Sequence, residues 1–195
     1  MYNVVKMGVP QQPENWSEEK TRNETDIIKT RVTRMIEQKL RDDPYAQEAF
    51  SKLLRQAIEE AEQLFDHPLK QYLLFHSFEE QVQARRLEDI PNAFAGNQHA
   101  QAYFGVFKKL LPEAFSGFDQ AAQEKWIKLA FEVDQVVDMA VNENSINPQN
   151  IEADIRKKLL QRMFKECKAL GGGMDQAKKI VEMVVQITRV GLIAV

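Results

Sequence analysis

The chain has 195 residues, 44% of them hydrophobic and 28% charged, so it has enough apolar material for a folded core and intrinsic disorder is disfavoured. Its formal net charge of −3 argues against a general nucleic-acid binder, which needs a basic excess, although a local basic patch stays compatible with it. The one cysteine, Cys167, excludes a disulfide within the chain. Neither a secretory signal pattern nor an apolar run long enough to span a membrane is present, so we expect a cytoplasmic protein.

The first 22 residues differ in character from the rest. Val4 and Val5 favour extended backbone, whereas Pro10 and Pro13 interrupt any helix. We therefore expect residues 1–22 to be an extended linker from a preceding domain, and residues 23–195 to form a helical domain.

Three helices are predicted in the first half of that domain. The first runs from about Thr25 to Leu40, the second follows the cap Asp43-Pro44, and the third follows His67-Pro68 and ends near Arg86. Apolar residues recur three and four positions apart in each helix, which predicts one core-facing stripe per helix. The stripes are Ile27, Ile28, Val32, Met35, Ile36 and Leu40; then Phe50, Leu53, Leu54, Ala57, Ile58, Ala61, Leu64 and Phe65; then Leu69, Tyr72, Leu73, Phe75, Phe78 and Val82.

Four further helices are predicted after a short turn at residues 89–97. The fourth covers Gln98 to Leu111, and the fifth ends near Asn142 and buries Trp126. The sixth begins at Asn147-Pro148 and ends at residues 171–173, three glycines that stop a helix; the last begins at Asp175. The fold class is therefore all-α, a helical bundle of about six to seven helices after an extended N-terminal lead-in, with a possible break into two subdomains near residues 112–119.

Motifs for chemistry are weak throughout. The glycine run is followed by Met174 and Asp175, and the Asp175 carboxylate would repel a phosphate group. None of His67, His76 and His99 has the spacing of a metal motif, although Glu79 and Glu80 lie within helical reach of His76. Three Glu-x-Lys matches (residues 18–20, 37–39 and 166–168) lie in helical sequence rather than on the strand that a nuclease core requires, so we interpret them as chance.

The lone thiol is predicted to be structural. A helical wheel places Cys167 in the apolar arc of the sixth helix, where burial would raise its pKa and make it inert. We therefore predict no catalytic, cofactor-binding or metal-binding residue in this chain.

One basic face is a candidate DNA contact. Lys158, Arg162, Lys165 and, at the edge, Lys168 lie on the sixth helix opposite its apolar arc. Residues 147–195 hold nine basic and five acidic residues, while the remainder of the chain is acidic. Such a face could follow a duplex DNA backbone, each cation neutralising about one phosphate, or it could be an ordinary solvated surface, which we favour.

Five segments resemble, in this order, the C-terminal helical region of the restriction (R) subunit of type I restriction–modification enzymes. They are ETDIIKTRVTRMIEQKLRDDPYAQEAFSKLL (24–54), LFDHPLKQYLLFHSFEEQV (64–82), NQHAQAYFGVF (97–107), INPQNIEADIRKKLL (146–160) and AKKIVEMVVQITRVGL (177–192). Each is a helix-packing pattern, so the joint order carries the resemblance rather than any single segment.

The resemblance implies an assembly function. In that family the complete subunit joins a nuclease and two ATP- and Mg²⁺-dependent motor lobes to this helical region, which docks them onto the modification and specificity subunits. No nuclease or helicase motif is found here, so we expect no enzyme activity from this chain alone, and residues 1–22 would link it to the motor. Two alternatives remain open: a DNA-backbone-binding module that uses the basic face, or a helical adaptor unrelated to restriction.

Overall fold

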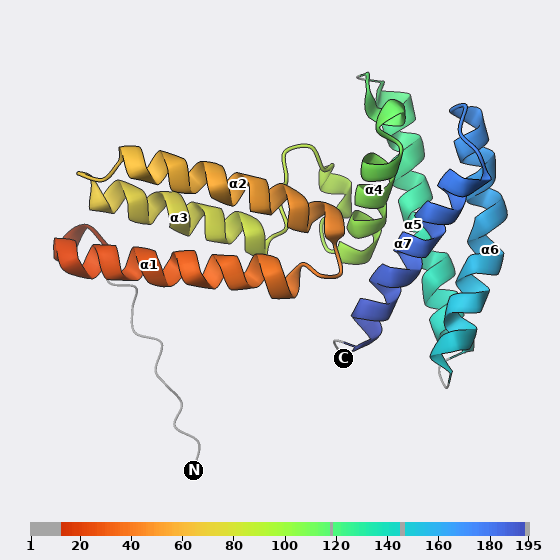
Figure 1. The fold of residues 1–195 in the computed structure, drawn as a ribbon, viewed down its shortest axis with the longest axis horizontal. Helices are drawn as coiled ribbons and strands as arrows, with labels where there is room; N and C mark the ends of the chain where they lie inside the picture. Colours follow the sequence, from red (N-terminus) through yellow and green to blue (C-terminus); the bar gives the residue numbers. More distant parts are fainter. Residues whose placement is uncertain (1–12, 118, 145–146, 194–195) are drawn as a thin grey trace, which may run out of the picture.

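The computed structural model describes residues 13–117, 119–144 and 147–193. Over these residues the chain forms seven α-helices and no strand, so the all-α prediction is confirmed (Figure 1). The helices are α1 (Glu18–Arg34), α2 (Pro44–Gln63), α3 (Pro68–Gln83), α4 (Gln98–Leu110), α5 (Gln120–Glu143), α6 (Pro148–Ala169) and α7 (Met174–Ile193). Four short helical turns join them: η1 (Pro13–Asn15), the π-helical η2 (Met35–Lys39), η3 (Asn92–Phe94) and η4 (Pro112–Phe115).

The helices gather into two units whose long axes cross (Figure 1). In the first unit α3 packs on both α1 and α2. In the second unit α4 contacts α5 and α7, and α6 closes the ring by contacting the same two helices, which is the arrangement of a four-helix bundle. Helix α2 also packs on α4 and so connects the units.

The predicted helix starts are largely confirmed by side-chain caps. Asp43, Asn97, Asp119 and Asn147 each precede a helix and accept a hydrogen bond from a backbone N–H of its first turn. These caps satisfy donors that have no partner within the helix. His67 precedes α3 without such a bond, so that start depends on Pro68 alone.

The start of α1 corrects the expected extended linker at residues 1–22. The Ser17 side chain accepts from the Lys20 backbone N–H at 3.2 Å, and Glu18 and Glu19 lie in the first turn, where carboxylates favour the helix dipole. The helix thus begins at Glu18 rather than near Thr25, and η1 precedes it. The part of the predicted linker with Val4, Val5 and Pro10 lies outside the described residues.

Two separate apolar cores stabilise the units. The first core belongs to α1–α3 and ends at Leu87, and the second begins at Phe94 and takes in α4–α7. We expected any break near residues 112–119, but Phe115 in that region packs against the second core. The cores therefore divide between Leu87 and Phe94, with the half-buried Ile90 touching both.

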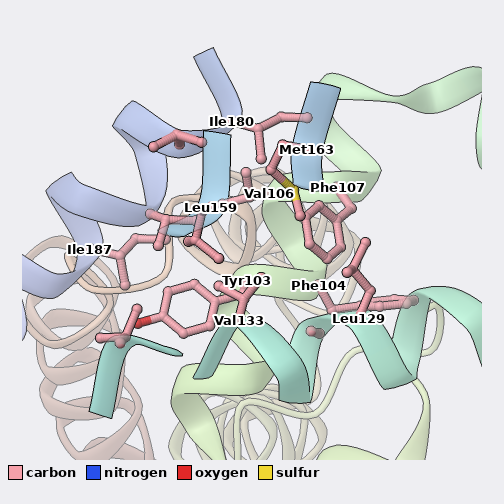
Figure 2. Packing of buried hydrophobic residues seen from close by; sticks show 14 of the residues in the cluster. Tyr103, Phe104, Val106, Phe107, Leu129, Val133, Leu159, Met163, Ile180 and Ile187 are labelled. Atoms are coloured by element: carbon pink, nitrogen blue, oxygen red, sulfur yellow. The ribbon is translucent and has the colours of Figure 1, made fainter. Parts of the chain in front are cut away.

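Aromatic and branched side chains interlock in the second core, as Figure 2 shows for Tyr103, Phe104, Leu129 and Ile187. Trp126 is 2% exposed, and its ring lies 5.3 Å from that of Phe107 and 5.8 Å from that of Phe115, measured between centroids. Such contacts add to the free energy that burial of apolar surface supplies.

Several residues of the predicted apolar stripes lie outside the cores. Phe50, Ala57 and Ala61 of α2 are buried as expected. The prediction is wrong for five others, which are 37% to 64% exposed: Ile27, Leu53, Ile58, Phe65 and Leu73. Three packed helices cover only part of each helix's circumference, so an apolar residue at the margin of a wide stripe stays at the surface.

The joint between the units includes a close helix crossing. Gly105 of α4 lies so near α2 that a Cβ atom added there would stand 2.6 Å from the Cβ of Tyr45. Only glycine permits this approach without a shift of one helix. The joint thus depends on the absence of a side chain at position 105.

Arg85 completes the joint at the end of α3. Its φ of 48° is left-handed, and the N–H groups of Arg85 and Arg86 donate to the carbonyls of Val82 and Gln81, which is the pairing of a Schellman helix end. The guanidinium donates to Asp42 at 2.8 Å. The Arg85 carbonyl accepts from Gln101 Nε2 of α4 at 2.9 Å. One residue therefore ends α3, holds the loop before α2 and contacts the second unit.

Replacement of Trp126 by alanine is expected to destabilise the protein by about 3–5 kcal/mol, because it removes a large buried side chain and leaves a cavity. Urea unfolding measures the change. Met139→Ala on the same helix is the control, since Met139 is 47% exposed and its loss should cost less than about 0.5 kcal/mol. Equal midpoints for the two variants would contradict the burial of Trp126.

Replacement of Arg85 separates its backbone contribution from its ion pair. Arg85→Ala should destabilise the protein by about 2–3 kcal/mol, because Asp42 loses a mostly buried partner. Arg85→Gly loses the same ion pair, but glycine adopts positive φ freely, so this variant should be more stable than Arg85→Ala by about 1 kcal/mol. Chemical unfolding of both variants tests this order, and a glycine variant that is no more stable than the alanine variant would contradict it.

Candidate functional site

The predicted basic face lies on α6, and all four of its side chains are exposed. Lys158 Nζ lies 2.7 Å from Asp154 Oδ2 and 2.9 Å from Glu143 Oε2. These hydrogen bonds raise the pKa of Lys158. Arg162 lies 3.1 Å from the buried Glu166 and 3.4 Å from Glu132. Two of the four cations are therefore paired within the chain.

The other half of the basic face is unpaired. Neither Lys165 nor Lys168 forms an ion pair with any residue in the described ranges. A phosphate backbone would thus meet two available cations and would have to compete with carboxylates for the other two. The structure places the four predicted residues together but leaves a weaker positive surface than their sequence suggests.

The predicted structural thiol is confirmed in its position. Cys167 is fully buried in the second core, and burial, with smaller contributions from Glu113 and Glu166, raises its pKa. A buried thiol in its neutral form is a weak nucleophile.

The histidines are spread over separate places. His67, His76 and His99 are exposed, and His76 Nδ1 lies 3.8 Å from Glu80. Among the residues that the structure describes, no three histidine, cysteine or acidic side chains come together as a metal-binding group.

A groove lies at the joint between the two units. It has a volume of about 650 Å³ and is lined by α2, by Gln81 of α3 and the segment after that helix, and by Lys109 of α4. Ala49 and Leu53, one turn apart on α2, form an apolar strip that continues to Leu87. The groove therefore has an apolar floor between charged walls.

One wall of the groove carries a pair of lysines around Glu48. Lys109 Nζ lies 2.7 Å and Lys52 Nζ 2.9 Å from the Glu48 carboxylate. Hydrogen bonds from Lys109 and then Lys52 lower the pKa of Glu48 to about 2. This carboxylate stays ionised at any physiological pH, so the wall keeps a fixed pattern of charge.

Asp89 also lines the groove. It accepts a hydrogen bond from the Tyr45 hydroxyl and one from Lys108 Nζ, the latter at 2.6 Å. Burial acts to raise the pKa of Asp89, but the hydrogen bonds from Lys108 and Tyr45 outweigh it, and the pKa falls. Asp89, in the segment between α3 and α4, thus contacts Tyr45 of α2 and Lys108 of α4 and links the two helices. The exposed Arg86 and Glu88 extend from the same loop into the groove lining without an ion pair in the described chain.

Sequence reasoning missed this groove. Helical periodicity assigns Leu53 to a core stripe, and the sequence predicts only a helix end near Arg86 and a turn from residue 89 onward. The groove forms because α2 crosses α4 at Gly105, and a crossing between distant segments leaves no periodic signal in the sequence. The one available signal was the apolar excess of α2, which has more apolar positions than one core-facing stripe needs.

The helix that forms the groove wall begins at a buried carboxylate. Asp43 is 1% exposed and accepts the Ala46 backbone N–H at 3.0 Å. Burial raises its pKa to about 6, despite opposing contributions from that hydrogen bond and from Arg85. Near neutral pH the folded protein therefore holds a buried charge at the start of α2.

The described helices include none that is both long and apolar enough to cross a membrane. Comparison of the chain with protein-family models, with curated proteins and with solved structures finds no match.

The shifted pKa of Asp43 predicts a pH-dependent effect of Asp43→Asn. The folded pKa lies above the unfolded value of about 4, so the folded protein takes up a proton as the pH falls from about 7 to 4, and its free energy of unfolding rises. Asparagine keeps the cap without the charge. As the pH rises from about 4 to about 7, the free energy of unfolding of the variant should therefore increase by about 2–3 kcal/mol relative to that of the wild type. Urea unfolding of both proteins across this range measures the difference, and a constant difference would rule the mechanism out.

Proposed function

We propose that this chain is the helical assembly domain of the R subunit of a type I restriction enzyme. In this proposal it docks the ATP-dependent subunit that translocates and cleaves DNA onto the modification and specificity subunits of a cytoplasmic complex. The chain itself contributes no catalytic, cofactor-binding or metal-binding residue; ATP and Mg²⁺ belong to the motor and nuclease of the complete subunit. The ordered resemblance of five segments supplies the identity of the partners.

The observation that carries a docking function is the groove at the joint. Its floor is apolar and its walls are charged, which is the composition of many protein–protein interfaces. Leu53 is 37% exposed there, although it is a large apolar residue. The α2 wall lies within the first of the five resembling segments.

The geometry of the groove is set before any partner arrives. Tyr45 and Lys108 converge on Asp89, and Lys109 crosses from α4 to Glu48 on α2. A preformed surface loses less conformational entropy on binding, which favours affinity.

The alternative of a DNA-backbone-binding module receives less support. Lys158 and Arg162 are paired with carboxylates of the same chain, which leaves Lys165 and Lys168 to contact phosphates. Protein docking therefore ranks above DNA binding. A helical adaptor unrelated to restriction would use the same groove with other partners.

A pull-down with the modification and specificity subunits from the same genome tests the proposal, with and without duplex DNA and at low and high salt. We expect the chain to be retained by the protein complex without DNA. Leu53→Glu should reduce retention at least about tenfold, because it places a charge on the apolar floor. Leu73→Glu is the matched control, since Leu73 is 50% exposed on α3 outside the groove and should have no effect.

Each other outcome of this experiment has a distinct meaning. Retention that Leu53→Glu leaves unchanged would keep the assembly function and reject the groove as its docking surface. Absence of retention under all conditions would reject the restriction assignment. Retention by DNA alone, lost steeply with salt, would assign the function to the basic face of α6 instead.

A further inference from the structure

The free end of the three-helix unit exposes an aromatic ring beside an exposed edge of α2. Phe65 follows the last turn of α2 and is 64% exposed. Ile58 of α2, seven residues earlier in the chain, is 40% exposed. Single apolar residues at a surface are ordinary, so the surroundings of these two decide whether they form a binding surface.

The Phe65 ring is held in place rather than left to rotate in solvent. Arg22 of α1 lies over it, with the guanidinium carbon 4.6 Å from the ring centroid. Arg22 also donates to the Phe65 carbonyl at 3.0 Å and to Glu18 at 2.8 Å. One face of the ring is therefore covered by α1, and the remainder is presented in a fixed orientation.

Acidic residues are frequent in the segments that contain Phe65 and Ile58. We call residues 13–24 and 58–70 the acidic apex; they form the ends of α1, α2 and α3 that lie farthest from the four-helix unit in Figure 1. The apex has eight acidic and three basic residues, a net charge of −5, whereas the whole chain has −3. The rest of the chain is thus slightly basic, and the negative charge is concentrated at one end of the molecule.

The apex carboxylates are available to a partner. Glu18 pairs with Arg22, and the seven others have no ion pair with any residue in the described ranges; they are Glu14, Glu19, Glu24, Glu59, Glu60, Glu62 and Asp66. The carboxylates of α6 differ, because Glu152, Asp154 and Glu166 are all paired with cations of the same chain. At most positions of the apex a cation from outside therefore displaces no ion pair among the described residues.

We propose that the acidic apex binds a basic, amphipathic segment of a protein partner. Apolar side chains of that segment pack on Phe65 and Ile58, and its lysines and arginines pair with the carboxylates of α2 and of the Ser17–Glu24 region. Charge complementarity selects this occupant, because a net charge of −5 attracts a basic chain and repels nucleic acid. Phe65 and Ile58 require apolar side chains on the partner, and small polycations do not have them. This inference concerns a surface separate from the groove and does not rest on the restriction assignment.

Binding of a short synthetic peptide tests the proposal. The probe is a fluorescent peptide of leucine and lysine with its leucines on one helical face, and binding to the full chain is followed by anisotropy. Phe65→Ala should weaken binding about tenfold through loss of the aromatic contact. The triple variant Glu59→Lys, Glu60→Lys, Glu62→Lys should weaken it by at least the same factor, since it reverses the charge beside the ring.

Two controls separate the apex from charge in general. Met139→Ala removes a side chain of similar exposure from α5, and Glu37→Lys, Glu124→Lys, Asp138→Lys makes the same change in net charge at exposed positions outside the apex. Both should bind the peptide within about twofold of the wild type. Circular dichroism of every variant confirms that the helices are intact.

A second peptide, with alanine in place of leucine, tests the apolar contribution. It should bind at least about tenfold more weakly than the first. The proposal is overturned if the two peptides bind equally, if Phe65→Ala leaves affinity unchanged, or if charge reversal outside the apex weakens binding as much as reversal within it.

Discussion

The end of α3 fixes how the two helical units meet. Arg85 adopts a left-handed backbone conformation there, so the chain turns sharply out of the helix. The Arg85 guanidinium donates a hydrogen bond to Asp42, and the Arg85 carbonyl accepts one from Gln101. On the neighbouring face of the joint, Gly105 allows α4 to approach Tyr45 closely. These contacts are few compared with those within either core. They nevertheless decide the relative position of α2 and α4, and therefore the shape of every surface to which both units contribute.

The elements of the fold follow from the sequence more closely than its surfaces do. Proline and cap residues predict the starts of α2 and α6, because the preference of Asp43 and Asn147 for a helix start is a local property. Burial of Trp126 and Cys167 follows equally from helical periodicity. The division of the core between Leu87 and Phe94 does not follow from periodicity, because it depends on which helices share an interior. Proline and glycine alone predict a break near residues 112–119 instead.

The candidate sites differ in the same way. Periodicity gathers Lys158, Arg162, Lys165 and Lys168 on one face of α6, and they do lie together. Their partners on α5, Glu132 and Glu143, come from another helix, so sequence reasoning overestimated the free charge. Helical spacing predicts that Leu53, Ile58 and Phe65 belong to the core, because apolar residues at this spacing look alike whether they face an interior or a partner. Apolar residues in excess of the core's needs are therefore the sequence signal of both surfaces proposed for this domain.

The crossing of α2 over α4 has a consequence for when the protein becomes competent to bind. Tyr45, Ala49 and Leu53 come from one folding unit and Lys109 from the other, so neither unit contains the groove by itself. A chain in which only the three-helix unit has folded lacks Lys109 and its ion pair with Glu48. In the docking that we propose, a partner that contacts both α2 and Lys109 therefore binds only molecules in which both units have folded.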